Sequence, residues 1–259
     1  MKFRIVILAA GKGTRMKQDI PKALTLVAGK PILQHLLESI EVSGLEMNPV
    51  IVIGKSGGAG SGSAGDSSIF QNAITHSCTY AIQEEQLGTG HAVQCARDYV
   101  TDADALIVLY GDHPFLSAST LNRITSTHKD HAAYITMATT TIPSTEGWYQ
   151  AFEKWGRILR DESGHVIGNR QFKDATDEEK QILERDPALF CFKTDWLWDR
   201  LARLKNENAQ GEYYLTDLVA MAFEEGIEIS TVSIPPEEAI GINTLEELKI
   251  AEAILRTRL

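Results

Sequence analysis

The sequence has 259 residues, of which 43% are hydrophobic and 23% are charged, a composition typical of a soluble globular protein with one large domain or two small ones. No apolar run reaches the length of about 18 residues that a membrane-spanning helix needs, and the N-terminus lacks the small-residue cleavage site of a signal peptide. Its three scattered cysteines are too few for a disulfide framework or a zinc site, so we expect a cytoplasmic protein.

The net charge of −10 argues against general nucleic-acid binding, but this charge is unevenly distributed. Residues 1–30 carry seven Lys or Arg and one Asp, a local charge of +6, which leaves −16 for the rest of the chain. A small basic cluster on an acidic protein suits a compact anionic ligand. A chance cluster of solvated cations would give the same pattern, so charge alone leaves both interpretations open.

Strand and helix patterns alternate through the first half of the chain. Short β-branched or apolar runs predict strands at residues 2–9, 50–53, 79–83, 105–110 and 133–141. Apolar residues at helical spacing predict helices at residues 31–43, 90–99 and 117–131, the last with Ser117 as its N-cap. This alternation predicts an α/β domain with a mostly parallel sheet, in which ligands bind at the carboxyl ends of the strands.

The pattern changes after about residue 142. Turn glycines and short strand-like pieces predict an excursion from the sheet at about residues 142–188. Beyond it we expect strands at 189–193 and 229–234, a helix at 215–225, and a final helix to about residue 256 that opens with a capping box at Thr244. The Gly- and Ser-rich residues 55–68 predict a flexible loop inside one domain of residues 1–259, either a passive tether or a lid.

A glycine loop follows the first predicted strand and is rich in groups that bind phosphate. It reads Leu8-Ala9-Ala10-Gly11-Lys12-Gly13-Thr14-Arg15-Met16, with Pro21-Lys22 after it. Glycines let backbone N–H groups approach phosphate oxygens, Arg15 can donate two parallel hydrogen bonds, and Lys22 adds a point charge. Met16 replaces the third glycine of a dinucleotide-binding loop, and the Gly-Lys-Ser/Thr of a Walker loop is absent.

This loop resembles the signature of the sugar-1-phosphate nucleotidylyltransferases, and most of all the uridylyltransferase (pyrophosphorylase) domain of the bacterial bifunctional N-acetylglucosamine-1-phosphate uridylyltransferases. Further similar motifs follow in the same order: Gln83-Glu84-Glu85-Gln86-Leu87-Gly88-Thr89-Gly90-His91-Ala92, Tyr110-Gly111-Asp112-His113-Pro114, Gly156-Arg157-Ile158, Lys173-Asp174-Ala175-Thr176-Asp177, Ala209-Gln210-Gly211-Glu212-Tyr213-Tyr214-Leu215-Thr216-Asp217, and Gly241-Ile242-Asn243. The resemblance covers nearly the whole chain and implies a Rossmann-like, mostly parallel sheet of the GT-A-like type. The acetyltransferase β-helix through which the bifunctional proteins form trimers is not expected here, and the oligomeric state stays open.

The resemblance implies a role for residues in each of these motifs. It implies catalytic roles for Arg15 and Lys22, and Mg²⁺ as a cofactor held by Asp112 and Asn243. Asp112 ends a predicted buried strand, where a carboxylate would face the ligand side of the sheet, and carboxylate and amide oxygens suit Mg²⁺. The resemblance also implies nucleotide binding, with Gln83 and the Gly88-Thr89 turn at the uracil edge, by Leu8, Ala9, Ala10, Gly11, Gly13, Thr14, Gln83, Gly88 and Thr89. Finally, it implies sugar-phosphate binding by Gly156, Gln171, Asp186, Tyr214 and Thr216.

Three positions of the implied sugar pocket differ from the family pattern. Gln171 and Asp186 stand where the family has a glutamate and an asparagine, and Trp155 stands where it has a tyrosine. An ionised Asp186 cannot donate a hydrogen bond, so we expect a changed sugar preference. We predict transfer of a uridylyl group from UTP to N-acetylglucosamine 1-phosphate or a related sugar 1-phosphate, with release of pyrophosphate. The alternatives are the same reaction on another sugar or nucleotide, or a non-catalytic nucleotide-sugar-binding module; no nucleic-acid or membrane partner is expected.

Overall fold

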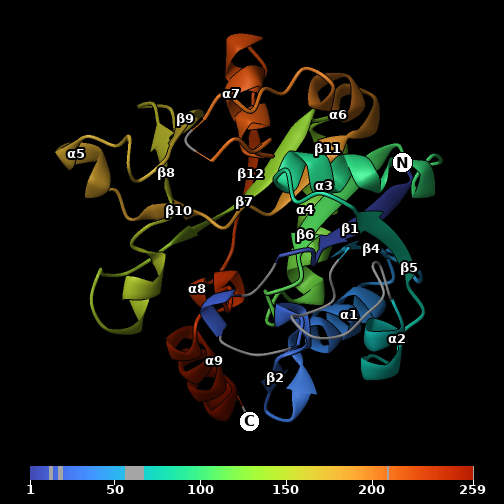
Figure 1. Cartoon of the computed structure of the whole chain (residues 1–259). Coiled ribbons are helices and arrows are strands. Elements are labelled where there is room, and N and C mark those ends of the chain that lie inside the picture. The colour runs from blue at the N-terminus through green and yellow to red at the C-terminus, as the bar shows by residue number, and fades with distance from the viewer. Residues whose placement is uncertain (12–13, 17–19, 56–66, 209, 259) are drawn as a thin grey trace.

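The computed structural model describes residues 1–11, 14–16, 20–55, 67–208 and 210–258 (Figure 1). Most of the predicted Gly/Ser loop, residues 56–66, lies outside this described part. Within it, ten strands form one sheet through the middle of the molecule. These strands are β1 (Phe3–Leu8), β4 (Val50–Gly54), β5 (Thr79–Gln83), β6 (Ala105–Tyr110), β7 (Ile135–Thr141), β8 (Gly156–Arg160), β9 (Val166–Arg170), β10 (Glu184–Asp186), β11 (Phe190–Lys193) and β12 (Ser230–Ser233). A separate two-stranded hairpin joins β2 (Leu26–Val27) to β3 (Lys30–Pro31).

Four parallel strands form the first half of the sheet, in the order β5–β4–β1–β6. β11 pairs antiparallel with both β6 and β7, so β7 runs parallel to the first four strands, and β12 adds a parallel partner to β7. β10, β8 and β9 continue the sheet beyond β7 as an antiparallel extension. The sheet is therefore mixed and mostly parallel, as predicted, and the predicted excursion at about residues 142–188 contains this extension.

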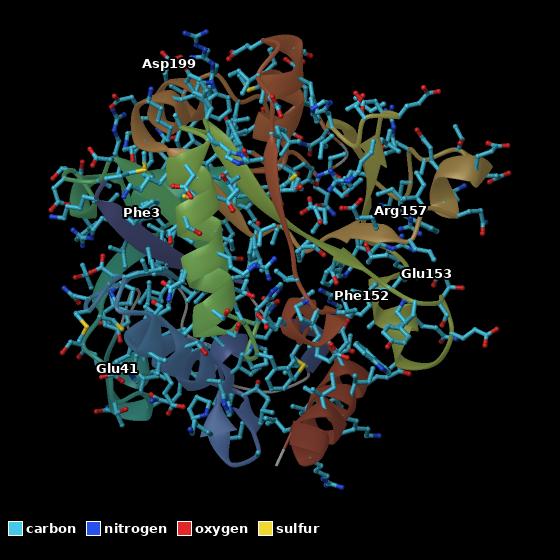
Figure 2. All side chains as sticks on the ribbon, turned by 180° about the vertical axis from the view of Figure 1, so that it is seen from behind. Phe3, Glu41, Phe152, Glu153, Arg157 and Asp199 are labelled. Atoms are coloured by element: carbon cyan, nitrogen blue, oxygen red, sulfur yellow. The ribbon has the colours of Figure 1, made fainter. Side chains whose placement is uncertain are left out.

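Helices cover both faces of the sheet, which explains why its central strands are almost continuously apolar. Successive side chains of β1 alternate between the two faces: Ile5 and Ile7 belong to one hydrophobic core, and Val6 and Leu8 to the other. Figure 1 looks onto α3 on the second face, and Figure 2, the view from behind, looks onto α4 on the first. The helices are α1 (Ile32–Ser43), α2 (Ser68–Ala73), α3 (Thr89–Cys95), α4 (Ala118–Asp130), α5 (Asp177–Lys180), α6 (Thr194–Leu201), α7 (Asp217–Glu224), α8 (Pro236–Ala239) and α9 (Leu245–Arg258). In the described part of the chain, none of them is both long and apolar enough to cross a membrane.

The predicted strands and helices are present, with boundaries that shift by a few residues. Ser117 is the N-cap of α4, since its hydroxyl accepts a hydrogen bond from the Thr120 backbone N–H at 3.1 Å. At the start of α9, Thr244 Oγ1 accepts from Glu247 N–H, but Glu247 Oε2 accepts from the backbone N–H of Asn243 rather than from that of Thr244. The short helices α2, α5, α6 and α8 are not predicted from the sequence.

The parallel strands bring their carboxyl ends to one edge of the sheet. Leu8, the last residue of β1, pairs with Tyr110, the last residue of β6, and Gln83 ends β5 beside Gly54 of β4. The segments that leave these strands carry the glycine loop, Asp112 and the Gln83 motif. The sheet therefore gathers three of the motifs in one place before any side chain is considered.

Candidate functional site

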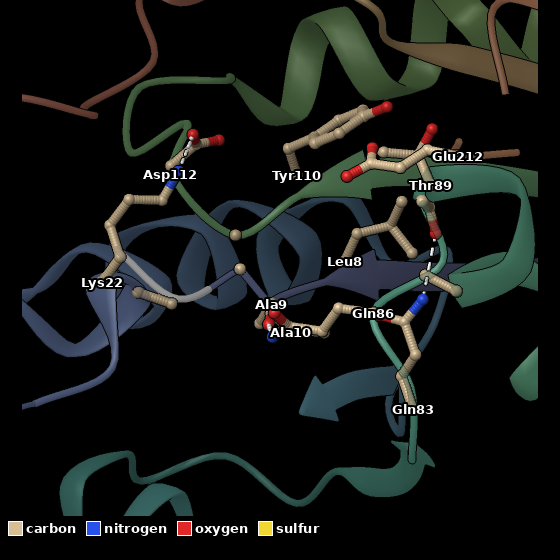
Figure 3. Close-up of a pocket in the computed structure, with 15 residues that line it drawn as sticks. Leu8, Ala9, Ala10, Lys22, Gln83, Gln86, Thr89, Tyr110, Asp112 and Glu212 are labelled. Atoms are coloured by element: carbon tan, nitrogen blue, oxygen red, sulfur yellow. Dashed lines mark hydrogen bonds and ion pairs between the residues drawn. The ribbon is translucent and has the colours of Figure 1, made fainter. Parts of the chain in front are cut away.

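A pocket of about 480 Å³ lies at this edge of the sheet (Figure 3). This volume is in the range of sites for small ligands. The predicted residues that line it are Leu8, Ala9, Ala10, Gly11, Lys22, Gln83, Gly88, Thr89 and Asp112. Gly13 lies outside the described residues, and only the backbone of Thr14 is described, in a short 3₁₀ turn (Thr14–Met16).

Six further residues line the pocket that we did not predict. They are Ala23, Gln86, Ala92, Tyr110, Gly111 and Glu212. Gln86 Nε2 donates a hydrogen bond to the Ala10 carbonyl and so ties the glycine loop to the segment after β5. Glu212 brings a carboxylate to the wall beside Tyr110 and Thr89 (Figure 3). Most of these residues lie inside the motifs described above, but those motifs did not indicate a role for these particular positions.

The glycine loop and the segment after β6 approach each other closely. The Gly111 N–H donates to the Leu8 carbonyl at 3.0 Å, and the Ala9 N–H donates to the Val52 carbonyl at 2.8 Å. A Cβ atom at Gly111 would lie 3.3 Å from the Ala9 Cβ and 3.4 Å from the Ala23 Cβ. A side chain at Gly111 would therefore have to displace Ala9 and Ala23 by a few tenths of an ångström.

Lys22, Asp112 and Asn243 form the polar centre of the site, which we call the Lys22 triad. The Lys22 ammonium lies 2.5 Å from Asp112 Oδ2 and 2.8 Å from Asn243 Oδ1. Arg15, whose side chain is exposed, donates to the same Asn243 oxygen at 3.3 Å. The Ile242 N–H donates to the Asp112 carbonyl at 2.9 Å, which brings the segment before α9 against the end of β6. The structure thus places the two catalytic candidates and the two metal-ligand candidates together.

Asp112 is buried and ionised. Burial would raise the pKa of its carboxyl, but the charge of the Lys22 ammonium and the hydrogen bond from it outweigh burial and lower the pKa. The neighbouring His113 has a lowered pKa because of burial, so its ring is neutral. One oxygen, Asp112 Oδ1, is buried and accepts no hydrogen bond from any described residue, although His113 Nε2 lies 3.5 Å away. A buried carboxylate oxygen without a donor is what a bound cation would satisfy.

The donor set fits Mg²⁺. Asp112 offers a free carboxylate oxygen, and Asn243 offers an amide oxygen that Lys22 and Arg15 now contact. Both are hard oxygen ligands, and Mg²⁺ in nucleotide sites takes few protein ligands and completes its shell with phosphate and water. Among the described residues, no three His, Cys, Asp or Glu side chains gather into a closed metal cage.

The opposite end of the pocket is built around a strained glycine. Gly88 has φ +105°, and a Cβ there would lie 2.6 Å from the Tyr213 carbonyl oxygen. The Tyr213 N–H donates to the Leu87 carbonyl at 2.7 Å, and Thr89 Oγ1 accepts from the Leu215 N–H at 2.9 Å. The segment that carries Glu212 is therefore fixed directly against the predicted base-binding turn.

The predicted sugar residues are only partly brought together. Gly156 of β8 pairs with Asp186 of β10, and Asn169 Nδ2 of β9 donates to Asp186 Oδ2 at 2.6 Å. Gln171 is exposed one residue beyond β9, and Tyr214 donates its hydroxyl to Gln210 at 2.5 Å. None of the five predicted sugar-phosphate residues is among the residues that line the pocket.

Asp186 is the chemically unusual member of this group. Burial raises the pKa of its carboxyl to about 6, even though hydrogen bonds from the Ala188 N–H and from Asn169 favour the ionised form. It forms no ion pair with any described residue. The carboxylate is therefore held in an apolar setting by two neutral donors alone.

Two buried arginines, Arg157 and Arg185, support the segment that precedes β8. Arg157 donates to the carbonyls of Glu153 at 2.6 Å and Trp155 at 2.5 Å, and Arg185 donates to the Phe152 carbonyl at 3.2 Å (Figure 2). Burial, together with the charge of Arg157, lowers the pKa of Arg185 to about 10. Their contacts hold Trp155, whose ring stacks at 15° and 6.4 Å on the ring of His113, next to Asp112.

Comparisons with known proteins show which proteins this chain is similar to. Residues 5–217 match the family model of the MobA-like NTP transferase domain. The chain is 37% identical over 260 residues to the bifunctional protein GlmU of Brevibacillus brevis; the match covers 100% of the chain and 52% of that protein, so the chain spans about half the length of the curated relatives it matches.

Solved structures with similar folds cover the whole chain at low identity. One is a UDP-glucose pyrophosphorylase complexed with UDP-glucose, with a TM-score of 0.74, 17% identity and 100% of both chains covered. Another is a CMP:2-keto-3-deoxy-manno-octonic acid synthetase complexed with CTP, with a TM-score of 0.71, 19% identity and 100% of both chains covered. These likenesses confirm the predicted GT-A-like fold class.

Proposed function

Since the chain belongs to the MobA-like NTP transferase domain family and is a nucleotidyltransferase, we propose that it transfers a uridylyl group from UTP to a sugar 1-phosphate and releases pyrophosphate. The observation that carries this proposal is the Lys22 triad at one end of a nucleotide-sized pocket. The Lys22 triad combines the cationic side chain of Lys22 with two oxygen ligands, from Asp112 and Asn243, near the glycine loop that follows β1. These are the groups that a phosphate-binding site for a charged nucleotide needs.

The proposed reaction asks the protein to position groups and to neutralise charge. A phosphate oxygen of the sugar 1-phosphate attacks the α-phosphorus of UTP in line and pyrophosphate leaves, so no protein side chain forms a bond. Lys22 and the exposed Arg15 both contact Asn243 Oδ1. Arg15 can turn toward phosphate oxygens freely, whereas Lys22 can do so only where another cation, such as Mg²⁺, takes its place beside the buried Asp112 carboxylate. Together they would stabilise the charge that develops during transfer.

Asp112 and Asn243 would hold Mg²⁺ in this site. When bound, the ion would supply positive charge to the phosphate oxygens and orient them for transfer. Asp112 is prepared for this role because its pKa is lowered, so it is ionised at neutral pH without a proton to displace. Its free Oδ1 is the atom that gains a partner.

The choice of sugar depends on the chemistry around Asp186, which we include in the proposed sugar pocket with Gly156. An acceptor-only carboxylate next to Gly156 favours sugars that donate hydrogen bonds at this position over those that accept them. This observation favours a second candidate, the same reaction on a sugar 1-phosphate other than N-acetylglucosamine 1-phosphate.

The experiment is pyrophosphate release from UTP with Mg²⁺ and a panel of sugar 1-phosphates that begins with N-acetylglucosamine 1-phosphate and includes N-acetylgalactosamine and N-acetylmuramic acid derivatives. We expect release with at least one acceptor, loss of release with a chelator, and loss in Asp112→Asn. Asp130→Asn, at the exposed end of α4, is the matched control and should retain wild-type release. UTP binding without release from any acceptor would refute the proposed activity.

A further inference from the structure

The side-chain amide of Gln83 is held in one orientation at the base end of the pocket. Gln83 ends β5, lines the pocket and is only 3% exposed. Its Nε2 donates to the Gly88 carbonyl at 3.0 Å and lies 3.1 Å from His91 Nδ1. An amide NH₂ group has two hydrogens, so these two partners use both. Oε1 accepts no hydrogen bond from a described residue and is the amide atom left for a ligand.

The partners of His91 define which of its nitrogens carries the proton. The Gly88 carbonyl can only accept, so it fixes the nitrogen of the Gln83 amide on this side. The second amide hydrogen then points at His91 Nδ1, which must therefore be an acceptor and carry no proton. In this arrangement the ring proton is on Nε2, 3.9 Å from the sulfur of Cys95 one turn later in α3.

We propose that His91 is a positioning residue for base selection: together with the Gly88 carbonyl, it holds the Gln83 amide so that its oxygen faces the nucleotide, which selects bases with an imide N–H, such as uracil, over cytosine. This inference rests on the proposed function, because it assumes that the base of the nucleotide meets Gln83. It adds a residue that does not itself line the pocket.

Hydrogen-bond chemistry gives the direction of the selection. Uracil presents N3–H, which can donate to Gln83 Oε1, whereas cytosine presents an unprotonated N3 that would face the same oxygen as a second acceptor. Flipping the amide, so that its nitrogen and oxygen exchange places, would suit cytosine. The flip would also turn Oε1 toward the Gly88 carbonyl, so two acceptors would meet without a donor, and His91 could keep its hydrogen bond only by moving its ring proton from Nε2 to Nδ1.

The test compares dissociation constants of UTP and CTP, measured by titration calorimetry with Mg²⁺ on the full chain. His91→Leu and His91→Phe remove the acceptor, while His91→Asn keeps an oxygen near the position of Nδ1. The UTP preference should fall about 3- to 10-fold in the first two variants, the size of one hydrogen bond, because the Gly88 carbonyl still restrains the amide. His91→Asn should retain most of the preference, and Cys95→Ala should leave it unchanged.

The ratio of the two constants separates a positioning role from a packing role, since damage to α3 would weaken both nucleotides alike. Suppose that the wild-type protein prefers UTP and that folded His91→Leu and His91→Phe variants keep the wild-type ratio of the two constants. This result would overturn the role of His91 and leave the proposed function intact. A wild-type protein that binds UTP and CTP equally would overturn both. Melting temperatures show whether His91→Leu and His91→Phe are folded, and only a folded variant is compared with the wild-type protein.

Discussion

Replacing Asp186 by asparagine should stabilise the protein at neutral and alkaline pH. The Asp186 carboxylate is buried, forms no ion pair with a described residue, and has two neutral donors, the Ala188 N–H and Asn169 Nδ2, both at 2.6 Å. An asparagine can still accept from the Ala188 N–H. Asn169 can rotate so that its oxygen accepts from the new amide, which keeps that hydrogen bond as well. The difference between the two proteins is then mainly the free energy of burying a charge.

The magnitude and its pH dependence follow from the raised pKa. The ordinary value of 3.8 applies to the unfolded chain and about 6 to the folded one, so the folded protein binds the proton more tightly between these values. Stability therefore falls as the pH rises from about 4 through 6. The difference between the folded and unfolded pKa values lowers the free energy of unfolding by roughly 3 kcal/mol at pH 8 and by roughly half of that at pH 5. The gain from Asp186→Asn should grow by about 1.5 kcal/mol between these two pH values.

Urea unfolding of both proteins at pH 5 and pH 8 measures this change, with Asp130→Asn on the surface as the control for a lost charge. Because asparagine also restores a donor to the proposed sugar pocket, the KM for N-acetylglucosamine 1-phosphate should fall in the same variant. A stability difference that is the same at both pH values, or an Asp186→Asn protein that is less stable at pH 8, would refute the reasoning.

Three further substitutions test the nucleotide end of the site. Arg15→Ala should lower turnover by about 100-fold and leave the melting temperature unchanged, because the side chain is exposed; unchanged turnover would remove it from the mechanism. Lys22→Met leaves the Asp112 carboxylate buried without its cation, so the free energy of unfolding measured in urea titrations should fall by about 2–3 kcal/mol. Mg²⁺ should restore part of this loss, and an unchanged free energy of unfolding would contradict a stabilising ion pair. Gly88→Ala, at φ +105° and 2.6 Å from the Tyr213 carbonyl, should cost roughly 2–4 kcal/mol and weaken UTP binding, and a wild-type melting temperature would disprove the predicted clash.

The sequence predicted well those elements whose signals are local. β5 and β6 have the predicted boundaries because each is a short run of residues that favour strands, and α1 follows the predicted spacing of its buried residues. α6 was missed because it begins directly after β11, where the N-cap Lys193 makes no side-chain hydrogen bond. A helix that begins without a capping residue gives no local signal for its start.

The site was less predictable because it depends on contacts between distant segments. The Lys22 ammonium joins Asp112 and Asn243, which follow it by 90 and 221 positions in the sequence, and only a resemblance between motifs suggested that they would meet. The contact of Gln86 with the Ala10 carbonyl joins segments 76 residues apart. The same limit applies to Asn169, whose pairing with Asp186 depends on the register of β8, β9 and β10.

The two ends of the site are built on parts of the sheet that differ in how freely they can change. The proposed nucleotide end stands at the carboxyl ends of the parallel strands, where Gly88 has no room for a side chain and Gly111 is closely packed. The proposed sugar end stands on the antiparallel extension, where the departures from the family pattern at Gln171 and Asp186 are found. Because the raised pKa of Asp186 implies a cost in stability, this carboxylate is more readily explained by what it binds than by what it packs against. We therefore expect the choice of sugar to change through the extension while the choice of nucleotide stays fixed by the Gln83 and Gly88 turn.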